Sequence, residues 1–566
     1  ALVNSLIAGL DAIGAQPGDV IGIISETRWE WMAADWAIIG LGAVTVAIYP
    51  SNVPDTLAFI LNDSGARYLF VQDKAQYDKL LGIRHQIPGV RRLFLFDDAD
   101  QVATDPWTMS FDALRALSTR TPAEADRFAA ERAAAIRPDD RVTLVYTSGT
   151  TGRPKGVVHT HGTFMAQVAA VRERLDTIRP GMVDLLFLPL AHVFGREEHF
   201  AGVDRGLSTV IAESIDTLVD DLKAARPDLF FSVPRIYEKA YAAIQARVEA
   251  GSSVQRRIFR WAERIGGRVS HLRERHKRIP LGLRLRDRLA DRLVFHRVRE
   301  AFGGNVKFAI TAAAPLDLKI LEFFNAAGVV LLEGWGLTET SGGFTLNRVS
   351  NYRFGTVGTV FAGHELRLDE DGEILVRGPC VFPGYHNNPA ATAEVFTPDG
   401  WFRTGDIGTV DGDGFVRIVD RKKDLIITAA GKNIAPQNVE NTLKKAPFVS
   451  QVAVYGDRRP YLVALVTLDP AQVAAWATAH SVTYTVIAEV YTNPQFRATF
   501  DEGFQAANRE LASYETVKYY DILPEDFTLE NELLTPTLKI RRRTIVQRYG
   551  DLFESLYHPT KSEIAR

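Results

Sequence analysis

Strand-like and helix-like patterns alternate near the start of the chain, and this alternation constrains the fold more than any other feature. A β-branched run at residues 20–24 precedes an amphipathic helical pattern at 29–41, and a run at 44–49 precedes a helical pattern that ends at Asn62. A third run follows at 68–71. The order βαβαβ predicts a parallel sheet covered by helices on both faces. Ligands of such sheets bind at the carboxyl ends of the strands.

A loop rich in glycine and hydroxyl side chains follows another strand-like run, Val142 to Val145. It reads YTSGTTGRPKG from Tyr146 to Gly156. Its glycines let backbone N–H groups turn toward a phosphate, its hydroxyls add donors, and Lys155 adds a positive charge. It is not a Walker loop, because Pro154 occupies the position of the second glycine. A generic turn is the competing interpretation. The candidate phosphate-binding residues beside Lys155 are Thr147, Ser148, Gly149, Thr150, Thr151 and Gly152.

The size and composition of the chain limit the kinds of protein it can be. A chain of 566 residues is too long for a single compact core, so we expect two or more domains. A net charge of −3 gives no reason to expect a nucleic-acid partner. The single cysteine, Cys380, excludes an intrachain disulfide and suits a reducing compartment, hence a cytoplasmic location.

No membrane span is predicted near the N-terminus. The most apolar run, residues 37–49, is shorter than the roughly 18 to 20 residues that a span requires, and it predicts a buried helix leading into a strand. The chain begins at Ala1, already within a helical spacing of leucines. We therefore expect a further segment upstream.

The middle of the chain contains polar and apolar stretches in turn. Residues 100–135 are mostly polar and predict a loop. Apolar runs at 185–188, 209–211 and 229–231 predict a second strand–helix unit of the same kind as the first. His192, within LPLAHVFGR, follows the first of these strands, and both a buried structural role and a functional role are open to it.

A strongly basic segment extends from residue 251 to 300. It has fifteen Lys and Arg residues against five Asp and Glu residues, interleaved with apolar residues at helical spacing. This pattern predicts a basic amphipathic helical insert. A solvated helix face and attraction to anionic lipid headgroups both fit it.

Two further strands lead into candidate nucleotide-binding segments. A strand at 306–310 precedes Ala312-Ala313-Ala314 and a helix that we expect Asp317 to cap and Gly328 to end. A strand at 329–332 leads into EGWGLTET, residues 333–340. Glycines on both sides of Trp335 favour a ring at a strand end where adenine can stack, although a core tryptophan is the alternative. In the same segment, Thr338 and Glu339 supply oxygens for phosphate and magnesium.

The longest candidate motif lies toward the C-terminus and reads DGWFRTGDIGTVDGDGFVRIVDRKKDLIITAAG from Asp399 to Gly431. Asp406, on a tight turn, can accept hydrogen bonds from ribose hydroxyls, and a local turn role is the alternative. The charged run 420–424 predicts a domain boundary.

Strand patterns at 449–455 and 462–468 and a helical pattern at 436–445 then predict a small α+β domain. Lys539 ends a Leu-Thr-Pro-Thr-Leu-Lys segment, and composition alone makes it a surface lysine.

The segments 146–156, 333–340 and 399–431 resemble, in order, the motifs of adenylate-forming (AMP-binding) enzymes, and the third is similar to the signature of bacterial long-chain fatty acyl-CoA synthetases. The resemblance implies an α/β fold with a large N-terminal domain of stacked αβ subdomains at 1–419. It also implies a hinge at 420–424 and a small mobile C-terminal α+β domain at 425–566. An insert similar to 251–300 occurs in long-chain synthetases.

The activity that the resemblance implies is that of a long-chain fatty acid–CoA ligase. Such an enzyme uses ATP and Mg²⁺ to form acyl-AMP with release of pyrophosphate, and then forms a thioester with coenzyme A. The implied partner is a long-chain fatty acid, with peripheral contact at the inner membrane face through the basic insert. The alternatives are a medium-chain or aryl acid–CoA ligase, an acyl-AMP ligase that does not use CoA, and a non-enzymatic acyl or nucleotide sensor. The acyl-AMP ligases carry an insertion before the Gly-Glu-Ile strand, whereas residues 355–378 are compact here.

The resemblance also implies roles for individual residues. Lys539 is the expected catalytic lysine of adenylation, His192 is expected to line the acyl carboxylate site, and Arg196 is expected to gate the acyl tunnel. The catalytic set is Lys539, Lys155, Thr338 and His192, with Glu339 as the magnesium ligand. The set that binds nucleotide or coenzyme A comprises Thr147 to Gly152, Ala313, Ala314, Glu333, Gly334, Trp335, Gly336, Asp406, Arg421, Lys423 at the hinge and Gly431 at the pantetheine tunnel. Family members usually have glycines where Ala312 and Ala313 stand, and tyrosine where Trp335 stands.

Overall fold

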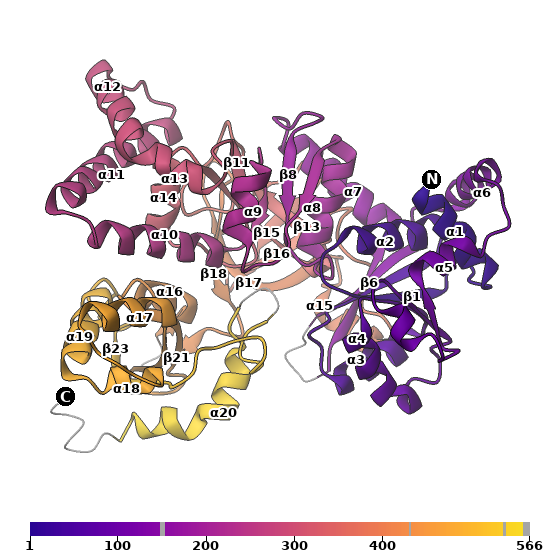
Figure 1. The fold of residues 1–566 in the computed structure, drawn as a ribbon. Coiled ribbons are helices and arrows are strands. Elements are labelled where there is room, and N and C mark those ends of the chain that lie inside the picture. Colours follow the sequence, from indigo (N-terminus) through magenta and orange to yellow (C-terminus); the bar gives the residue numbers. More distant parts are fainter. Residues whose placement is uncertain (148–152, 430–431, 536–538, 559–566) are drawn as a thin grey trace.

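The computed structural model describes residues 1–147, 153–429, 432–535 and 539–558 (Figure 1). The first seven strands form a single sheet in the order β5-β4-β3-β1-β2-β6-β7. All neighbours are parallel except β6 and β7. The strands are β1 (Val20–Ile24), β2 (Val44–Ile48), β3 (Ala66–Val71), β4 (Arg92–Leu95), β5 (Thr108–Ser110), β6 (Arg141–Thr147) and β7 (Lys155–Thr160). The predicted βαβαβ order is confirmed.

Helices cover both faces of this sheet, as predicted. Side chains of α1, α2, α5 and α6 form a core with one face, and side chains of α3 and α4 form a core with the other. The helices are α1 (Leu2–Ala12), α2 (Trp29–Leu41), α3 (Pro54–Ser64), α4 (Lys74–Gly82), α5 (Phe111–Ala116) and α6 (Pro122–Ala135). The apolar run 37–49 is the end of α2 and strand β2, buried as expected.

The loop predicted at 100–135 is wrong, because α5 and α6 occupy most of it. Thr121 and Glu124 form a reciprocal capping box at the start of α6, and Pro122 lies in its first turn. These contacts satisfy backbone N–H groups that a helix start leaves without partners. The sequence Thr-Pro-Ala-Glu is typical of a helix start and could have predicted this helix. The mostly polar composition of α6 instead favoured a loop.

The second strand–helix unit, predicted from the apolar runs 185–188, 209–211 and 229–231, is only partly correct. Strands β8 (Val183–Leu186) and β9 (Ser208–Ile211) form a two-stranded parallel sheet with α7 (His161–Arg174), α8 (Val193–Arg205) and α9 (Leu218–Ala225) nearby. The third strand, β10 (Phe231–Ser232), instead begins a five-stranded sheet by pairing with β11 (Phe308–Thr311). The rest of that sheet is β12 (Val330–Leu337), β13 (Gly342–Leu346) and β14 (Thr359–Val360). As expected, Asp317 caps α14 (Leu318–Ala326).

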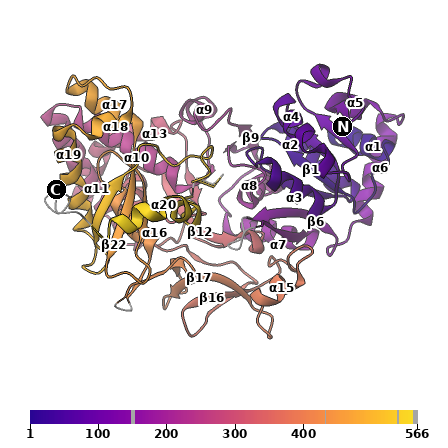
Figure 2. The same ribbon diagram turned by 90° about the horizontal axis from the view of Figure 1, so that it is seen from below.

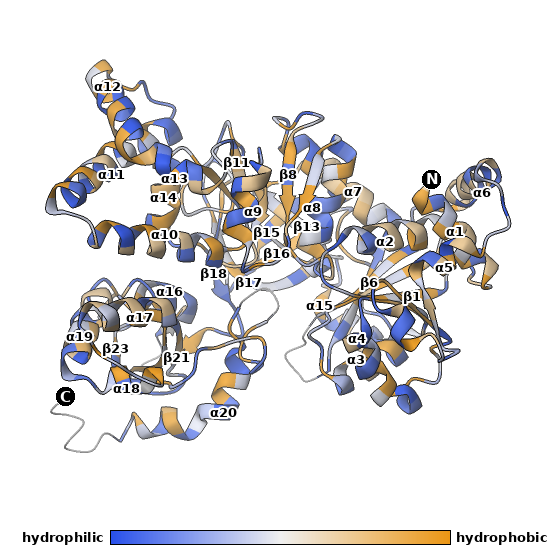
Figure 3. Cartoon of the chain, viewed as in Figure 1, coloured by the Kyte–Doolittle hydropathy of each residue, from blue (hydrophilic) through white to orange (hydrophobic). Residues whose placement is uncertain are grey.

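The basic insert is helical, as predicted. It comprises α11 (Ser253–Glu274), α12 (Leu281–Ala290), the π-helical segment η3 (Asp291–Phe295) and α13 (His296–Ala301), after α10 (Pro234–Glu249). Phe259 of α11 contacts Phe323 of α14, which holds the insert on the five-stranded sheet. Figure 1 shows α12 at an outer corner of the molecule, and Figure 3 shows hydrophilic and hydrophobic residues mixed along it.

A four-stranded antiparallel sheet links the large lobe to the C-terminal domain. It contains β15 (Glu365–Leu368), β16 (Glu373–Arg377), β17 (Phe402–Val410) and β18 (Val416–Arg421), with α15 (Pro389–Val395) alongside. Figure 2 shows the seven-stranded sheet on one side of the molecule and the C-terminal domain with the insert on the other.

The C-terminal domain is α+β, and its predicted strands are confirmed. Strands β21 (Val449–Tyr455), β22 (Leu462–Leu468) and β23 (Val517–Ile522) form its sheet, and β19 (Ile426–Ile427) pairs with β20 (Asn433–Ile434). Its helices are α16 (Pro436–Leu443), α17 (Pro470–Ala479), α18 (Ile487–Tyr491), α19 (Pro494–Asn508) and α20 (Arg542–Ser555). Within the described residues of the whole chain, no helix is both long and apolar enough to cross a bilayer.

Candidate active site

A cavity of about 1430 Å³ lies between the large lobe and the C-terminal domain. Lys155, Trp335 and Asp406, which are far apart in the sequence, all line it. The predicted site residues that line it are Thr147, Lys155, His192, Ala313, Ala314, Glu333, Gly334, Trp335, Gly336, Thr338, Glu339, Asp406, Arg421, Lys423 and Lys539. The predicted residues Ser148, Gly149, Thr150, Thr151, Gly152 and Gly431 lie outside the described residues.

Lys155 and Glu339 are connected through a tyrosine. The Lys155 Nζ lies 5.0 Å from the centre of the Tyr385 ring, and the Tyr385 hydroxyl donates a hydrogen bond to Glu339 Oε1 at 2.8 Å. A cation over an aromatic face is attracted to it, so the ring holds the ammonium near the carboxylate. Thr147 pairs with Lys155 across the β6–β7 hairpin. Sequence reasoning missed Tyr385, an aromatic residue among Gly, His and Asn residues that usually form turns.

Asp406, Arg421 and Trp335 form a second group. Asp406 is opposite Arg421 in the β17–β18 pair, and the Arg421 Nε lies 2.7 Å from Asp406 Oδ1. The Trp335 indole N–H donates to Asp406 Oδ2 at 2.7 Å. Both residues lie inside strands, Asp406 in β17 and Trp335 in β12, so the predicted turn and strand-end positions are wrong. These contacts fix the indole and the carboxylate in the cavity wall.

His192 and Lys539 enter the cavity from different domains. The Nδ1 of His192 accepts a hydrogen bond from the Phe194 N–H at the start of α8. Burial, with a smaller effect of the Lys539 charge, lowers the pKa of His192 to about 4, so the ring is neutral at pH 7. Burial also lowers the pKa of Lys539 to about 8, with Arg421 lowering it further and Asp406 opposing this. Lys539 is therefore still mainly protonated at pH 7 and supplies a positive charge to the cavity.

Two residues of the cavity wall are in unusual states. Burial raises the pKa of Glu333 to about 8, and Oε2 of this carboxyl has no hydrogen-bond partner among the described residues. The backbone φ of Ala313 is +73°, in the left-handed region that favours glycine. Glycine would adopt this conformation freely, whereas alanine adopts it at the cost of strain.

Arg196 does not line the cavity, so the predicted acyl gate is wrong. Its side chain is fully buried, and the guanidinium Nη2 lies 2.7 Å from each carboxylate oxygen of Asp35. Nη1 donates to the Thr143 hydroxyl. The helix α8 directs this residue into the core of the large lobe, where Asp35 neutralises its charge.

Glu197, the next residue, lines the cavity instead. Its carboxylate accepts hydrogen bonds from Gln167 Nε2 at 2.7 Å and from the Gly343 N–H at 3.0 Å. Burial raises the pKa of Glu197 to about 7, although both hydrogen bonds oppose the shift. A Cβ on Gly342 would lie 2.3 Å from this carboxylate, and the φ of Gly342 is +122°, so both the space and the backbone favour glycine beside it. No motif in the sequence distinguishes Glu197 from its neighbours.

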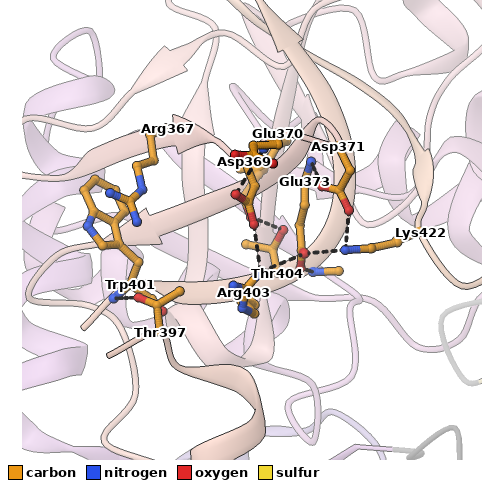
Figure 4. Close-up of polar contacts among 12 residues, drawn as sticks. Arg367, Asp369, Glu370, Asp371, Glu373, Thr397, Trp401, Arg403, Thr404 and Lys422 are labelled. Carbon is orange, nitrogen blue, oxygen red and sulfur yellow. Dashed lines mark hydrogen bonds and ion pairs between the residues drawn. The ribbon is translucent and has the colours of Figure 1, made fainter. Parts of the chain in front are cut away.

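Three acidic residues gather at the β15–β16 turn, outside the motifs (Figure 4). Asp369 pairs with Arg403 at 2.9 Å, and Asp371 and Glu373 pair with Lys422 at 2.5 and 2.9 Å. Each of the three carboxylates already has a basic partner, so we assign them a structural role. Through Lys422 they attach the segment that follows β18 to the four-stranded sheet.

Direct contacts join the two lobes beside the cavity. The Arg235 guanidinium donates to the Ser450 carbonyl at 3.0 Å and to the Ser450 hydroxyl oxygen at 2.9 Å. Lys445 of the C-terminal domain pairs with Asp317 of the large lobe at 3.0 Å. These contacts belong to the arrangement in which Lys539 faces Asp406 and Arg421 across the cavity.

The chain matches a known family over most of its length. The AMP-binding enzyme family matches residues 1–386, and the AMP-binding enzyme C-terminal domain family matches residues 423–561. The chain is 37% identical over 558 residues to the long-chain-fatty-acid–CoA ligase FadD15 of Mycobacterium bovis, covering 98% of this chain and 91% of the relative. It is 30% identical to the human long-chain-fatty-acid–CoA ligase 1, covering 96% and 79% of the two chains.

Solved structures share the fold at lower identity. The adenylation domain of a carboxylate reductase from Mycobacterium chelonae superposes with a TM-score of 0.75 at 23% identity, covering 99% of this chain and 83% of that one. The A domain of the carboxylic acid reductase from Segniliparus rugosus, solved with AMP and a carboxylic acid, gives 0.72 at 24% identity, covering 98% and 86%.

Proposed function

Since the chain belongs to the AMP-binding enzyme family, we propose that it acts as a long-chain fatty acid–CoA ligase. Relatives that carry this name match nearly the full length of the chain at 30–37% identity. The observation that most directly supports the proposal is that Lys539, from the C-terminal domain, lines the same cavity as Lys155 and Asp406 of the large lobe. A cationic cleft between two lobes suits a triphosphate and a carboxylate.

The proposed reaction has two steps. A carboxylate oxygen of the fatty acid attacks the α-phosphorus of ATP, the bond to the bridging oxygen breaks, and pyrophosphate leaves. The sulfur of coenzyme A then attacks the acyl carbon, the bond to the AMP oxygen breaks, AMP leaves, and the thiol proton passes to solvent. Attack of one anion on another requires positive charge near the phosphates, which Lys155 and Lys539 supply. Neutral His192 offers an Nε2 proton for a hydrogen bond to the acyl carboxylate.

The nucleotide-binding part of the proposal is assigned to the two groups in the cavity wall. Asp406 and Arg421 are proposed to bind the ribose, and Trp335 with the Ala313–Ala314 segment to contact the adenine. Thr147 and the following loop, Ser148 to Gly152, are proposed to bind the phosphates.

Magnesium fits the oxygen atoms that Thr338 and Glu339 present. These residues are adjacent in a short helical turn, η4 (Thr338–Thr340), that lines the cavity. A carboxylate and a hydroxyl are hard ligands of the kind that Mg²⁺ prefers. The ion, when bound, would neutralise phosphate charge.

We place the hinge of the proposed enzyme at 420–424, between an N-terminal domain at 1–419 and a C-terminal domain at 425–566. Rotation about Lys423 would exchange Lys539 for the segment around Gly431 and admit coenzyme A, as domain closure does in other enzymes. The compact hairpin at 365–377 supports the use of coenzyme A, because nothing inserted there obstructs the rotation.

We also propose a cytoplasmic location with peripheral contact at a membrane. The single cysteine, Cys380, is buried, which suits a cytoplasmic protein. The excess of basic residues between 251 and 300 supports peripheral contact with a membrane.

Pyrophosphate release and acyl-CoA formation test the proposal together. The purified chain is incubated with ATP, Mg²⁺, coenzyme A and acids of increasing length, with each component omitted in turn. We expect both products, with the highest kcat/KM for long-chain acids. Pyrophosphate without thioester would favour an acyl-AMP ligase. Faster turnover of medium-chain or aryl acids would correct the substrate class, and no acid-dependent pyrophosphate would favour a sensor.

A further inference from the structure

Helix α12 and the segment η3 carry a row of four exposed leucines. Leu281, Leu285, Leu289 and Leu293 are 79%, 65%, 51% and 42% exposed. Residues four apart lie on one face of a helix, with a drift of about 40° at each step. The wider turn of the π-helical η3 holds more residues per turn, which reduces this drift at Leu293. The leucines therefore form one continuous apolar stripe.

A row of arginines runs beside the leucines. Arg284, Arg288 and Arg292 each precede a leucine of the stripe by one residue, so they repeat at the same spacing along its edge. All three are exposed, and within the described residues none of them has an ion pair with an acidic side chain. By contrast, Arg273 pairs with Asp287 and Arg299 pairs with Asp291. Asp287 and Asp291 thus form ion pairs with other arginines of the insert, and, in the part of the chain that the structure describes, the arginines along the outer edge of the leucine stripe keep an uncompensated positive charge.

The opposite side of α12 is anchored in the protein. Leu283, Ala290 and Phe295 are buried, and a Cβ on Gly266 of α11 would lie 2.6 Å from the Phe295 ring. The buried Leu283 and Ala290 of α12, together with this close packing of Phe295 in η3, fix which face of the two segments points outward. The leucine stripe is therefore not a misplaced part of the core, and Figure 1 shows α12 far from the seven-stranded sheet and the C-terminal domain.

We infer that the outward face of α12 and η3, formed by these four leucines and three arginines, docks on an anionic lipid bilayer. An interfacial helix inserts its apolar stripe at the boundary of headgroups and acyl chains and leaves its basic edge at the phosphates. A second copy of the chain would bury the leucines but would bring two arginine rows together. Nucleic acid would neutralise the arginines and leave the leucines in water. The inference rests on the proposed function, because long-chain acids partition into bilayers and docking would bring the enzyme to its substrate.

Vesicle flotation tests the docking face. The full chain is mixed with phosphatidylcholine vesicles, either pure or with about one third phosphatidylglycerol. We expect binding to the anionic vesicles that weakens as salt is raised. The double variant Leu285→Asn, Leu289→Asn should bind the anionic vesicles at least about tenfold more weakly. Arg284→Gln with Arg288→Gln and Arg292→Gln should weaken it roughly a hundredfold.

Matched controls lie elsewhere on the surface. Leu81→Asn with Leu117→Asn changes two leucines that are 43% and 40% exposed outside the insert, and Arg127→Gln changes an exposed arginine of α6. These variants should bind like the unchanged chain. Leucine variants that bind anionic vesicles as tightly as the unchanged chain would overturn the inference. So would size-exclusion data in which the leucine changes convert a dimer into a monomer while vesicle binding is unaffected.

Activity on octanoate without vesicles separates this inference from the proposed function. The α12 variants should form octanoyl-CoA at the rate of the unchanged chain, and should be slower only on long-chain acid embedded in anionic vesicles. If the unchanged chain forms no thioester from any acid, the proposed function fails while the flotation result still decides the docking face.

Discussion

Lys539 is the residue whose removal should separate the two half-reactions. Its ammonium is mainly protonated at pH 7 and belongs to the C-terminal domain. Under the proposed rotation of that domain, it can act in only one domain arrangement. We expect Lys539→Ala to slow adenylate formation by about 10² to 10³, the loss typical of one preorganised charge-stabilising group. Single-turnover pyrophosphate release measures this. Thioester formation from preformed acyl adenylate should be unchanged, and equal loss of both steps would contradict the assignment.

Ala313 offers a test of backbone strain in the cavity wall. Its φ of +73° costs an L-residue about 1 to 2 kcal/mol, more than the extra chain entropy that glycine loses on folding. We expect Ala313→Gly to raise the free energy of unfolding by about 0.5 kcal/mol. Ala312→Gly is the matched control, because Ala312 has no positive φ, and it should lower stability by about 0.5 to 1 kcal/mol. Denaturant titration measures both, and changes of the same sign would refute the strain argument.

Glu197 should make stability depend on pH. Its pKa is about 7 in the folded protein and 4.5 ordinarily, so the unfolded chain releases this proton first as pH rises. The contribution of Glu197 to the free energy of unfolding therefore falls between about pH 4.5 and 7 and is constant above that window. Glu197→Gln keeps the shape and stays neutral. Relative to this variant, the unchanged chain should lose roughly 3 kcal/mol across the window.

Urea titrations of both proteins at several pH values measure the Glu197 effect. The neighbouring Asp184 and Glu198 carboxyls also have raised pKa values because they are buried, and both are present in the two proteins. The Glu197 charge contributes a minor part of the Glu198 shift, so the difference between the proteins includes this coupling. If the free energies of unfolding of the two proteins changed in parallel with pH, Glu197 would be ionised in the folded protein across the whole window, and the prediction would be wrong.

At the scale of elements, the Arg196–Asp35 pair connects α8 to α2. Removing one partner of a buried pair leaves an uncompensated charge, which costs about 3 to 5 kcal/mol. We expect Arg196→Met to lose stability by that amount and to keep the chain-length preference of the enzyme. Adding Asp35→Leu should recover most of the loss. A stable Arg196→Met protein with an altered chain-length preference would restore the gate hypothesis.

Elements with regular burial could be predicted from the sequence. The bounds of β1, α2, β21 and β22 are those of the apolar patterns, because each element buries a continuous run or stripe. Helix α6 gives only a weak apolar pattern, because few of its residues are buried, and its clearest signal is the capping box at its start. Strand β10 was assigned to the wrong sheet, since pairing between Phe231 and Ile310 depends on residues far apart in the sequence.

The role of some residues depends on the packing of the whole molecule and cannot be predicted from a single motif. Arg196 resembles a functional arginine in sequence, and only the packing of α8 on α2 shows that it is structural. Tyr385 and Glu197 carry no motif, and their positions in the cavity arise where separate subdomains meet. By contrast, Lys155 and Asp406 lie in strong local motifs, Lys539 is the lysine that the family resemblance implies, and all three line one cavity.

The contact between Arg235 and Ser450 should favour the arrangement in which Lys539 faces the cavity. Arg235 lies on the large lobe and Ser450 on the C-terminal domain, so the proposed rotation about 420–424 would break both hydrogen bonds. A hydrogen bond to a charged group contributes about 1.5 to 3 kcal/mol, part of which water replaces when the lobes separate. We therefore expect Arg235→Ala to shift the domain equilibrium and to slow adenylate formation about five- to tenfold.

Thioester formation from preformed adenylate should be equal or faster in the same Arg235→Ala protein, because the rotated arrangement becomes easier to reach. Arg247→Ala on the same helix, α10, is the control, since this exposed side chain should leave both half-reactions unchanged. Stopped-flow assays of the two steps distinguish the outcomes. If Arg235→Ala slows both steps equally, the contact stabilises the fold without selecting a domain arrangement, and the control of the reaction lies in the hinge itself.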